Sequence, residues 1–122
     1  MRPVLRLAAV GAVAVGAMGS LAGCGSPSGD PIGVTATDSS CRPASTDLRA
    51  GRLTFAVTNR GRKTTELYLY APGDRVVGEV EDVGPGTTRD LTATVRAGDY
   101  QLACKPGMRG PGIRADVHVS AM

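Results

Sequence analysis

The side chains with the clearest chemistry in this 122-residue chain are its three cysteines, Cys24, Cys41 and Cys104. Cys24 closes an apolar N-terminal run, which leaves Cys41 and Cys104 as the thiol pair of the remaining chain. Two thiols in an oxidising compartment most simply form a disulfide, and closing so long a loop contributes roughly 4 kcal/mol. Both could instead be thiolate ligands of a soft or borderline metal ion. The disulfide is the favoured interpretation, and the metal-ligand alternative stays open.

The N-terminus has the pattern of a secretory signal. Arg2 and Arg6 flank the start of an apolar run that begins at Leu5 and ends in Leu-Ala-Gly before Cys24. This ending resembles the bacterial lipobox, in which the cysteine thiol receives a diacylglycerol and becomes the new N-terminus. Two acyl chains hold a protein at a bilayer. We therefore expect a lipoprotein signal peptide over residues 1–23, a membrane-lipid anchor at Cys24 and a location on the extracytoplasmic face of the cell membrane.

Removal of that signal changes the charge of the chain. The full chain has 14 basic and 11 acidic residues, and the two arginines of the signal leave with it, so the mature charge is close to neutral. A near-neutral domain gives no reason to expect nucleic-acid binding. Residues 24–31 are rich in Gly, Ser and Pro and are predicted to be a flexible tether. A single folded domain is expected over residues 32–122.

Apolar residues in this domain recur with a period of two rather than 3.6. Leu67 and Leu69, for example, should face one way, with Glu66, Tyr68 and Tyr70 facing the other. Turn signals rich in Gly, Pro, Asn and Asp separate the segments. The pattern predicts an all-β, Greek-key β-sandwich of about seven to eight strands. The segments that carry it are 32–38, 52–59, 65–70, 75–81, 87–95, 100–104 and 113–119.

The segment 100–110 resembles the metal-binding hairpin of cupredoxins, in which a strand delivers a cysteine and a Pro-Gly-His turn follows it. Met108 stands here where the histidine is expected. A blue-copper site needs two imidazoles and a thiolate, and this chain has one histidine, His118. His118 alternates with Val117 and Val119 and should face solvent. These residues exclude a blue-copper electron carrier.

Four pieces of the domain, taken in order, resemble the N-terminal cupredoxin-like domain of EfeO-type iron-uptake proteins. The resemblance covers roughly residues 32–120. Those proteins usually continue into an imelysin-like helical domain with a His-x-x-Glu metal motif, which this sequence does not contain, so functions of that second domain are not carried over. The matching pieces are 35–38 with Cys41, 55–61 with 65–70, 73–86, and 104–108 with 112–114.

The resemblance implies two metal sites, for copper or ferric iron, beside a membrane iron transporter. Thiolate and thioether ligands suit Cu(I), and carboxylates suit a hard ion such as Fe(III). Two carboxylates two residues apart on a strand share a face, although a solvated acidic strand edge is the alternative interpretation. One site would comprise Cys41, Glu66 and Cys104 with Met108 nearby, and the other Asp74, Glu79 and Glu81.

Three classes of function remain open on these observations. The first is a lipid-anchored module that binds iron or copper for uptake, and the second is an oxidase of ferrous iron. The third is a metal-free, disulfide-stapled interaction domain. No Ser-His-Asp set, P-loop or His-rich zinc motif is present, so hydrolase and nucleotide chemistry have no support. We favour the metal-binding module and expect no catalytic residues.

Overall fold

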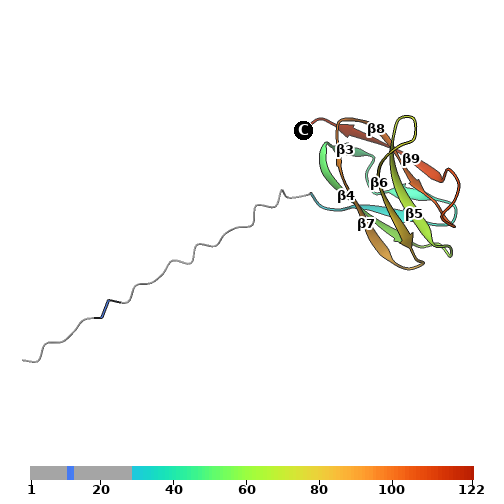
Figure 1. Cartoon of the computed structure of the whole chain (residues 1–122), viewed down its shortest axis with the longest axis horizontal. Helices are drawn as coiled ribbons and strands as arrows, with labels where there is room; N and C mark the ends of the chain where they lie inside the picture. The colour runs from blue at the N-terminus through green and yellow to red at the C-terminus, as the bar shows by residue number, and fades with distance from the viewer. Residues whose placement is uncertain (1–10, 13–28) are drawn as a thin grey trace, which may run out of the picture.

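Nine β-strands make up the part of the chain that the computed structural model describes, residues 11–12 and 29–122. They form two facing sheets (Figure 1), one with the strand order β2-β1-β4-β7 and the other with the order β3-β9-β8-β5-β6. This confirms the predicted all-β sandwich, with nine strands in place of seven or eight. The strands are β1 (Ile32–Ala36), β2 (Cys41–Pro43), β3 (Asp47–Arg49), β4 (Gly51–Asn59), β5 (Thr65–Ala71), β6 (Arg75–Val83), β7 (Thr88–Val95), β8 (Gly98–Cys104) and β9 (Ile113–Ser120).

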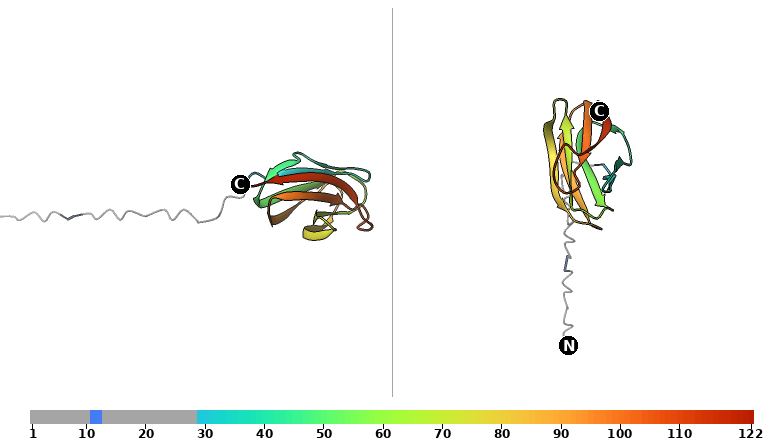
Figure 2. Two further views of the ribbon diagram at one scale, coloured as in Figure 1. Left: turned by 90° about the horizontal axis from the view of Figure 1, so that it is seen from above. Right: turned by 90° about the vertical axis from the view of Figure 1, so that its right-hand side faces the viewer.

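The pairing mixes two directions. β1 runs parallel to β4, and β3 runs parallel to β9, while the other neighbours are antiparallel. Residues 29–31 and the C-terminus lie at the same end of the domain in Figure 1 and in the left view of Figure 2. The loops β4–β5 and β8–β9 lie at the opposite end of their strands, where Gly107 N donates to Thr64 O at 2.8 Å.

The core lies between the sheets and follows from the alternation of the strands. On β5, Leu67 and Leu69 are buried against the other sheet while Tyr68 points outward, as predicted. Phe55 on β4 is also fully buried. Burial of a large apolar side chain of this kind contributes about 1.5–3 kcal/mol. A core with one phenylalanine and no tryptophan is thin for a domain of this size.

A disulfide between Cys41 and Cys104 staples the two sheets. Cys41 begins β2 in the four-stranded sheet, and Cys104 ends β8 in the five-stranded sheet. The sulfur atoms are bonded at 2.00 Å, and the Cα atoms lie 5.5 Å apart, within the usual range for a disulfide. Cys104 is completely buried. The favoured interpretation of these two cysteines is therefore confirmed.

Two strands were not predicted from the sequence, and both are short. β2 and β3 have three residues each, too few to show a period of two. Each joins a sheet edge: Ala36 of β1 pairs with Cys41, and Leu48 of β3 pairs with Val119 of β9. Their positions come from pairing with distant strands rather than from local sequence, and this accounts for the extra strands.

Cys24 and all of the predicted signal except residues 11–12 lie outside the described residues, so these predictions stay as predictions. Within the residues that the structure describes, no helix is both long and apolar enough to span a bilayer.

Candidate functional site

The outer face of the five-stranded sheet carries two stacked tyrosines beside two cations. The rings of Tyr68 and Tyr70 are nearly parallel, with centroids 5.4 Å apart. Lys105 Nζ lies 3.9 Å from the centroid of Tyr68, and Arg114 Cζ lies 4.3 Å from that of Tyr70. Cations at these distances are attracted to the ring faces by about 0.5–1 kcal/mol at exposed sites. The stack therefore fixes the direction of both phenol groups.

Two carboxylates lie on the same face of the sheet as Tyr68. Glu79 on β6 pairs directly with Tyr68 on β5, and Glu66 precedes Tyr68 by two residues and so shares its face. The Glu79 carboxylate on the paired strand favours the neutral phenol and so raises the pKa of Tyr68 above its ordinary value. Burial of the phenol and the negative charges of Glu66 and Glu79 raise it further. We call Glu66, Tyr68 and Glu79 the oxygen cluster.

The burial of the oxygen cluster is uneven. Glu66 is only 9% exposed, although it is a charged residue, and Glu79 is exposed. Among the described residues, neither carboxylate has a Lys, Arg or His nitrogen within 4.0 Å. Among the described residues, no fully buried side-chain oxygen lacks a hydrogen-bond partner, so the Glu66 carboxylate is not stranded away from water. The cluster thus holds two negative charges that the described side chains do not pair with a cation.

The same outer face also has a pocket of about 560 Å³, at the end of the sheet where β9 finishes. Four aspartates and one histidine line it together with Tyr70, Tyr100 and Gln101. The charged residues of this acidic pocket are Asp47, Asp74, Asp99, Asp116 and His118.

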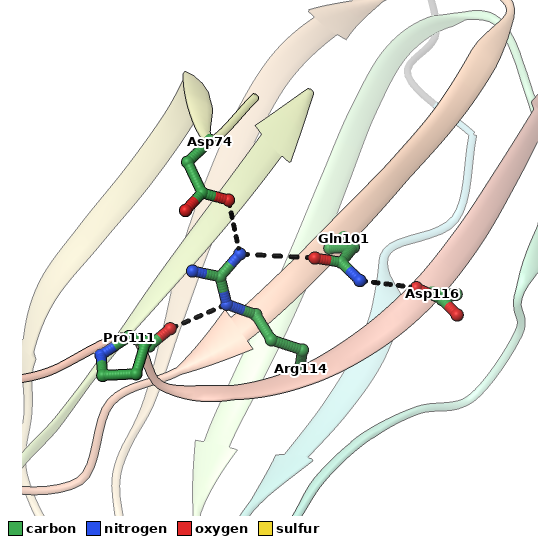
Figure 3. A network of polar contacts seen from close by, with 5 residues as sticks. All are labelled: Asp74, Gln101, Pro111, Arg114 and Asp116. Atoms are coloured by element: carbon green, nitrogen blue, oxygen red, sulfur yellow. Dashed lines mark hydrogen bonds and ion pairs between the residues drawn. The ribbon is translucent and has the colours of Figure 1, made fainter. Parts of the chain in front are cut away.

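Most carboxylates of the acidic pocket already have partners. Figure 3 shows Arg114 at the centre of a network: its Nη1 donates to Asp74 at 2.9 Å and to Gln101 at 3.3 Å, and its Nε donates to Pro111 O at 2.7 Å. Gln101 in turn donates to Asp116 at 2.8 Å. His118 Nδ1 lies 2.7 Å from Asp99. The pocket is acidic in composition, and three of its four aspartates have a side-chain hydrogen-bond or ion-pair partner.

The Asp38 carboxylate differs from those of the cluster and the pocket because its partners are main-chain N–H groups. Its oxygens accept hydrogen bonds from the main-chain N–H groups of Lys63 and Arg62 at 3.1–3.2 Å. These bonds lower the pKa of Asp38 below its ordinary value of 3.8. Asp38 therefore holds the loop between β4 and β5, next to the turn that follows β8.

The structure separates the residues expected to form the first metal site. Cys104 pairs with Leu67 and faces the core, whereas Glu66 precedes Leu67 and faces outward. The bonded sulfurs of Cys41 and Cys104 offer no thiolate in this form. Met108 is 41% exposed and takes a φ of 56° after the Pro-Gly turn, in which its N–H donates to Lys105 O. These four residues do not converge.

The second expected group, Asp74, Glu79 and Glu81, is also dispersed. Asp74 reaches across to Arg114 on β9, and the β5–β6 pairing shifts register twice along its length. Glu81 is exposed, and its carbonyl accepts a hydrogen bond from Arg89. Among the described residues, no three His, Cys, Asp or Glu side chains lie close enough to hold one metal ion.

One member of the oxygen cluster was missed by sequence reasoning, the phenol of Tyr68. Tyrosine was counted there as an outward-facing strand residue and not as an oxygen donor. The signal that could have found it is the alternation Glu66-x-Tyr68-x-Tyr70, which places a carboxylate and a phenol on one face. His118 is exposed between two buried valines, as predicted.

The chain is similar to known proteins that have this architecture. A family model described as the cupredoxin-like domain matches residues 7–113. The chain is also similar to the iron uptake system component EfeO of Escherichia coli K12 and of Shigella flexneri, with 33% identity over 73 residues. That region is 60% of this chain and 19% of each relative, so the chain spans about a fifth of their length.

Two solved structures have a similar arrangement of strands. Dithionite-reduced auracyanin from Roseiflexus castenholzii superposes with a TM-score of 0.55 at 13% identity, covering 77% of this chain and 99% of that one. The azurin Az-iso2 from Methylomonas sp. strain J gives 0.54 at 13% identity, covering 72% of this chain and 95% of that one. At this identity the likeness concerns the two-sheet fold alone.

Proposed function

Because this chain belongs to the cupredoxin-like domain family, we propose that it is a lipid-anchored, extracytoplasmic protein that binds a metal ion during iron uptake or metal handling. The observation that carries the proposal is its relation to EfeO, whose name describes an iron uptake component. The Leu-Ala-Gly-Cys sequence that ends at Cys24 supports the anchor. A membrane iron transporter is the partner that such a role requires.

The choice between copper and iron follows from the donor atoms. A blue-copper centre needs two imidazoles and a thiolate, while this chain has one histidine, and Cys41 and Cys104 are bonded to each other. The residues present do not fit that centre. Carboxylate and phenol oxygens are hard donors and suit Fe(III). We therefore propose iron as the cargo when the disulfide is intact, with copper binding only when the two thiols are free.

The metal-free alternative has two observations in its favour. The disulfide joins the two sheets, and the dispersed Asp74, Glu79 and Glu81 give no preformed three-carboxylate group. A stapled sandwich of this kind could act as an interaction domain for a membrane partner. It predicts that neither iron nor copper binds in any redox state of the cysteines.

Equilibrium titration of the processed protein tests the metal proposal. We expect saturable binding of Fe(III), supplied as its citrate complex, while the disulfide is intact, and binding of Cu(I) only after reduction. The matched control is Asp74→Asn/Asp116→Asn, which removes pocket carboxylates that already have partners and should keep the affinity for iron. Absence of binding for both metals in both redox states would leave the interaction domain as the function.

The anchor has a separate test. Intact mass spectrometry of protein extracted from membranes should show residues 24–122 plus at least a diacylglyceryl group. A Cys24→Ser variant should lose both the added mass and the membrane association. An unmodified wild-type chain cut at another position would contradict the anchor without touching the metal proposal.

A further inference from the structure

Two loops that lie side by side at one end of the sandwich carry a group of exposed cations. The loops join β4 to β5 and β8 to β9, at the end of the domain opposite residues 29–31 (Figure 2). A hydrogen bond from Gly107 N to Thr64 O at 2.8 Å links them. One large apolar side chain, that of Met108, is 41% exposed on the same pair of loops. We call this surface the loop patch, and its residues are Arg60, Arg62, Lys63, Met108 and Arg109.

The backbone of the β4–β5 loop, which carries three of the cations, is held in place by two side chains. The buried Asn59 donates through Nδ2 to Lys63 O and accepts a hydrogen bond from Gly61 N, both at 2.8 Å. The Asp38 carboxylate accepts hydrogen bonds from the main-chain N–H groups of Arg62 and Lys63 at 3.1–3.2 Å. Gly61 packs so closely that a Cβ there would lie 2.9 Å from Asp38 N. These contacts fix the loop without using the side-chain nitrogen atoms of its cations.

Met108 is also held in a fixed position on the β8–β9 loop. Its N–H donates to Lys105 O at 2.8 Å, within the turn that Gly107 ties to Thr64. Its φ of 56° lies in the left-handed region, which residues other than glycine rarely adopt. A conformation of this kind costs about 1–3 kcal/mol and is concentrated at functional sites. An exposed methionine that is kept in it is a second sign, besides the cations, that this surface makes a contact.

The four cations of the loop patch have no acidic partners among the described side chains. None of their side-chain nitrogen atoms has an Asp or Glu oxygen within 4.0 Å. Asp38 lies beside the patch, but its oxygens are occupied by main-chain N–H groups. Glu81 and Asp82 are on the edge strand β6, where Arg89 donates to Glu81 O. Lys105 is left out of the patch because its ammonium group lies over a tyrosine ring. The patch therefore presents unpaired positive charge on a fixed backbone.

We propose that the loop patch docks on an acidic surface of a partner protein, with Met108 entering an apolar hollow and the four cations facing carboxylates around it. This goes beyond the proposed function and does not depend on metal binding. Arginine and methionine are enriched in protein interfaces, whereas lysine is depleted, and three of the four cations are arginines. A guanidinium group also binds a carboxylate through two parallel hydrogen bonds. Complementary charge increases the rate of encounter and fixes the orientation of the partners.

A bilayer is the other anionic surface that a cationic patch can meet, and the position of the patch argues against it. Residues 24–31 reach at most about 29 Å when fully extended, and the nine residues of β4 alone span about 30 Å. An anchor at Cys24 would therefore hold the end that carries residues 29–31 nearest the bilayer. The loop patch, at the opposite end, would then point away from the lipid headgroups and toward proteins.

Fluorescence anisotropy of a labelled peptide made of glutamate and leucine tests the docking surface on the processed protein. We expect saturable binding that weakens as the salt concentration rises. Arg62→Gln/Lys63→Gln should reduce the affinity on the order of tenfold, because two cations of the patch are removed. The matched control is Arg42→Gln/Arg52→Gln, which removes two exposed cations from the four-stranded sheet and should leave the affinity unchanged. Met108→Ala should abolish the preference for this peptide over an all-glutamate peptide.

Three results would overturn the loop patch as a protein-docking surface. The first is the absence of saturable binding by the wild type, and the second is an equal loss of affinity in the two double variants, which would mean attraction to net charge alone. The third concerns lipid: in nanodiscs, the amides of residues 60–64 and 105–110 should exchange hydrogen equally fast in phosphatidylglycerol and in phosphatidylcholine. Slower exchange in phosphatidylglycerol would assign the patch to lipid headgroups. The thermal midpoints of the variants, which changes at exposed side chains should barely move, show that the fold is retained.

Discussion

The oxygen cluster and the acidic pocket lie on the same face of one sheet, but their carboxylates differ in whether they have side-chain partners. The pocket has four aspartates, and three of them have side-chain partners: Arg114 for Asp74, His118 for Asp99, and Gln101 for Asp116. The oxygen cluster has two glutamates on the same face as Tyr68, and neither forms an ion pair within 4.0 Å among the described residues, although Lys105 lies over the Tyr68 ring.

The difference shows that the number of acidic side chains does not identify a metal site. In the pocket, a metal ion would have to displace Arg114 or break a hydrogen bond, and each such contact opposes binding. In the cluster, a cation would have no ion pair to break among the described side chains, because neither Glu66 nor Glu79 forms one. The contacts of the pocket carboxylates are therefore part of the structure of the fold, whereas the two glutamates of the cluster form no ion pair among the described side chains.

The largest expected effect comes from opening the disulfide. Cys41→Ser/Cys104→Ser should lower the free energy of unfolding by about 4 kcal/mol, because the bond closes a loop with a sequence separation of 63 residues. Cys104 lies next to Lys105, whose N–H contacts Glu66 O. Hydrogen exchange at that amide should therefore rise more than at Asp99 beside the pocket. Equal increases at both amides would contradict a cluster held locally by the disulfide.

A smaller loss of stability is expected when the pocket network is opened. Arg114→Met removes the hydrogen bonds to Asp74, Gln101 and Pro111 O and the contact with the Tyr70 ring. Urea unfolding should show a loss of about 1–2 kcal/mol, discounted because Asp74 is largely exposed. Iron affinity should stay within about twofold, a change below roughly 0.5 kcal/mol. A large loss of iron binding would mean that the two regions are not independent.

The pair of His118 and Asp99 should contribute less. Both side chains are more than half exposed, and exposed ion pairs contribute at most about 1 kcal/mol. His118→Gln keeps a hydrogen-bonding side chain and should cost no more than about 0.5 kcal/mol in urea unfolding at neutral pH. A loss comparable to that of Arg114→Met would show that the pocket depends on this pair.

The smallest expected effect on stability comes from Asp38 and should appear only at acidic pH. The pKa of Asp38 is lower in the folded protein than its ordinary value of 3.8, so the folded state binds fewer protons than the unfolded one near that pH. Its contribution is therefore present above about pH 4 and is lost as the pH falls through the folded-state pKa. Asp38→Asn should flatten the acid side of the stability curve. The control is Asp90→Asn, an exposed aspartate on β7, which should leave the curve unchanged.

Most of the fold could be predicted from the sequence because apolar and polar residues alternate along each of the longer strands. The outward and inward faces of β5, the exposure of His118 and the all-β sandwich all follow from a period of two. β2 and β3 could not be found in this way, since three-residue strands depend on distant partners. The disulfide was favoured because an oxidising compartment was expected. That it joins the two sheets could be seen only from the strand order.

The candidate site was harder to predict because the register between β5 and β6 determines which side chains lie side by side. Glu79 and Glu81 share strand parity, but only Glu79 pairs with Tyr68, and the register shifts along β5 and β6 cannot be read from the sequence. Asp74 precedes β6 in sequence and yet contacts Arg114 on β9. Spacing along the sequence could only nominate candidate residues, while cross-strand pairing determines which of them lie side by side.

X-ray absorption at the iron edge tests the central claim most directly, that the protein with an intact disulfide holds iron without a sulfur ligand. The processed wild type, loaded with Fe(III) and with no free thiol detected, should show only oxygen or nitrogen atoms in the first coordination shell. Arg114→Met, which opens the pocket network, should give the same spectrum. A sulfur atom in the first shell would contradict the account, because the ligand would then be Cys41, Cys104 or a methionine.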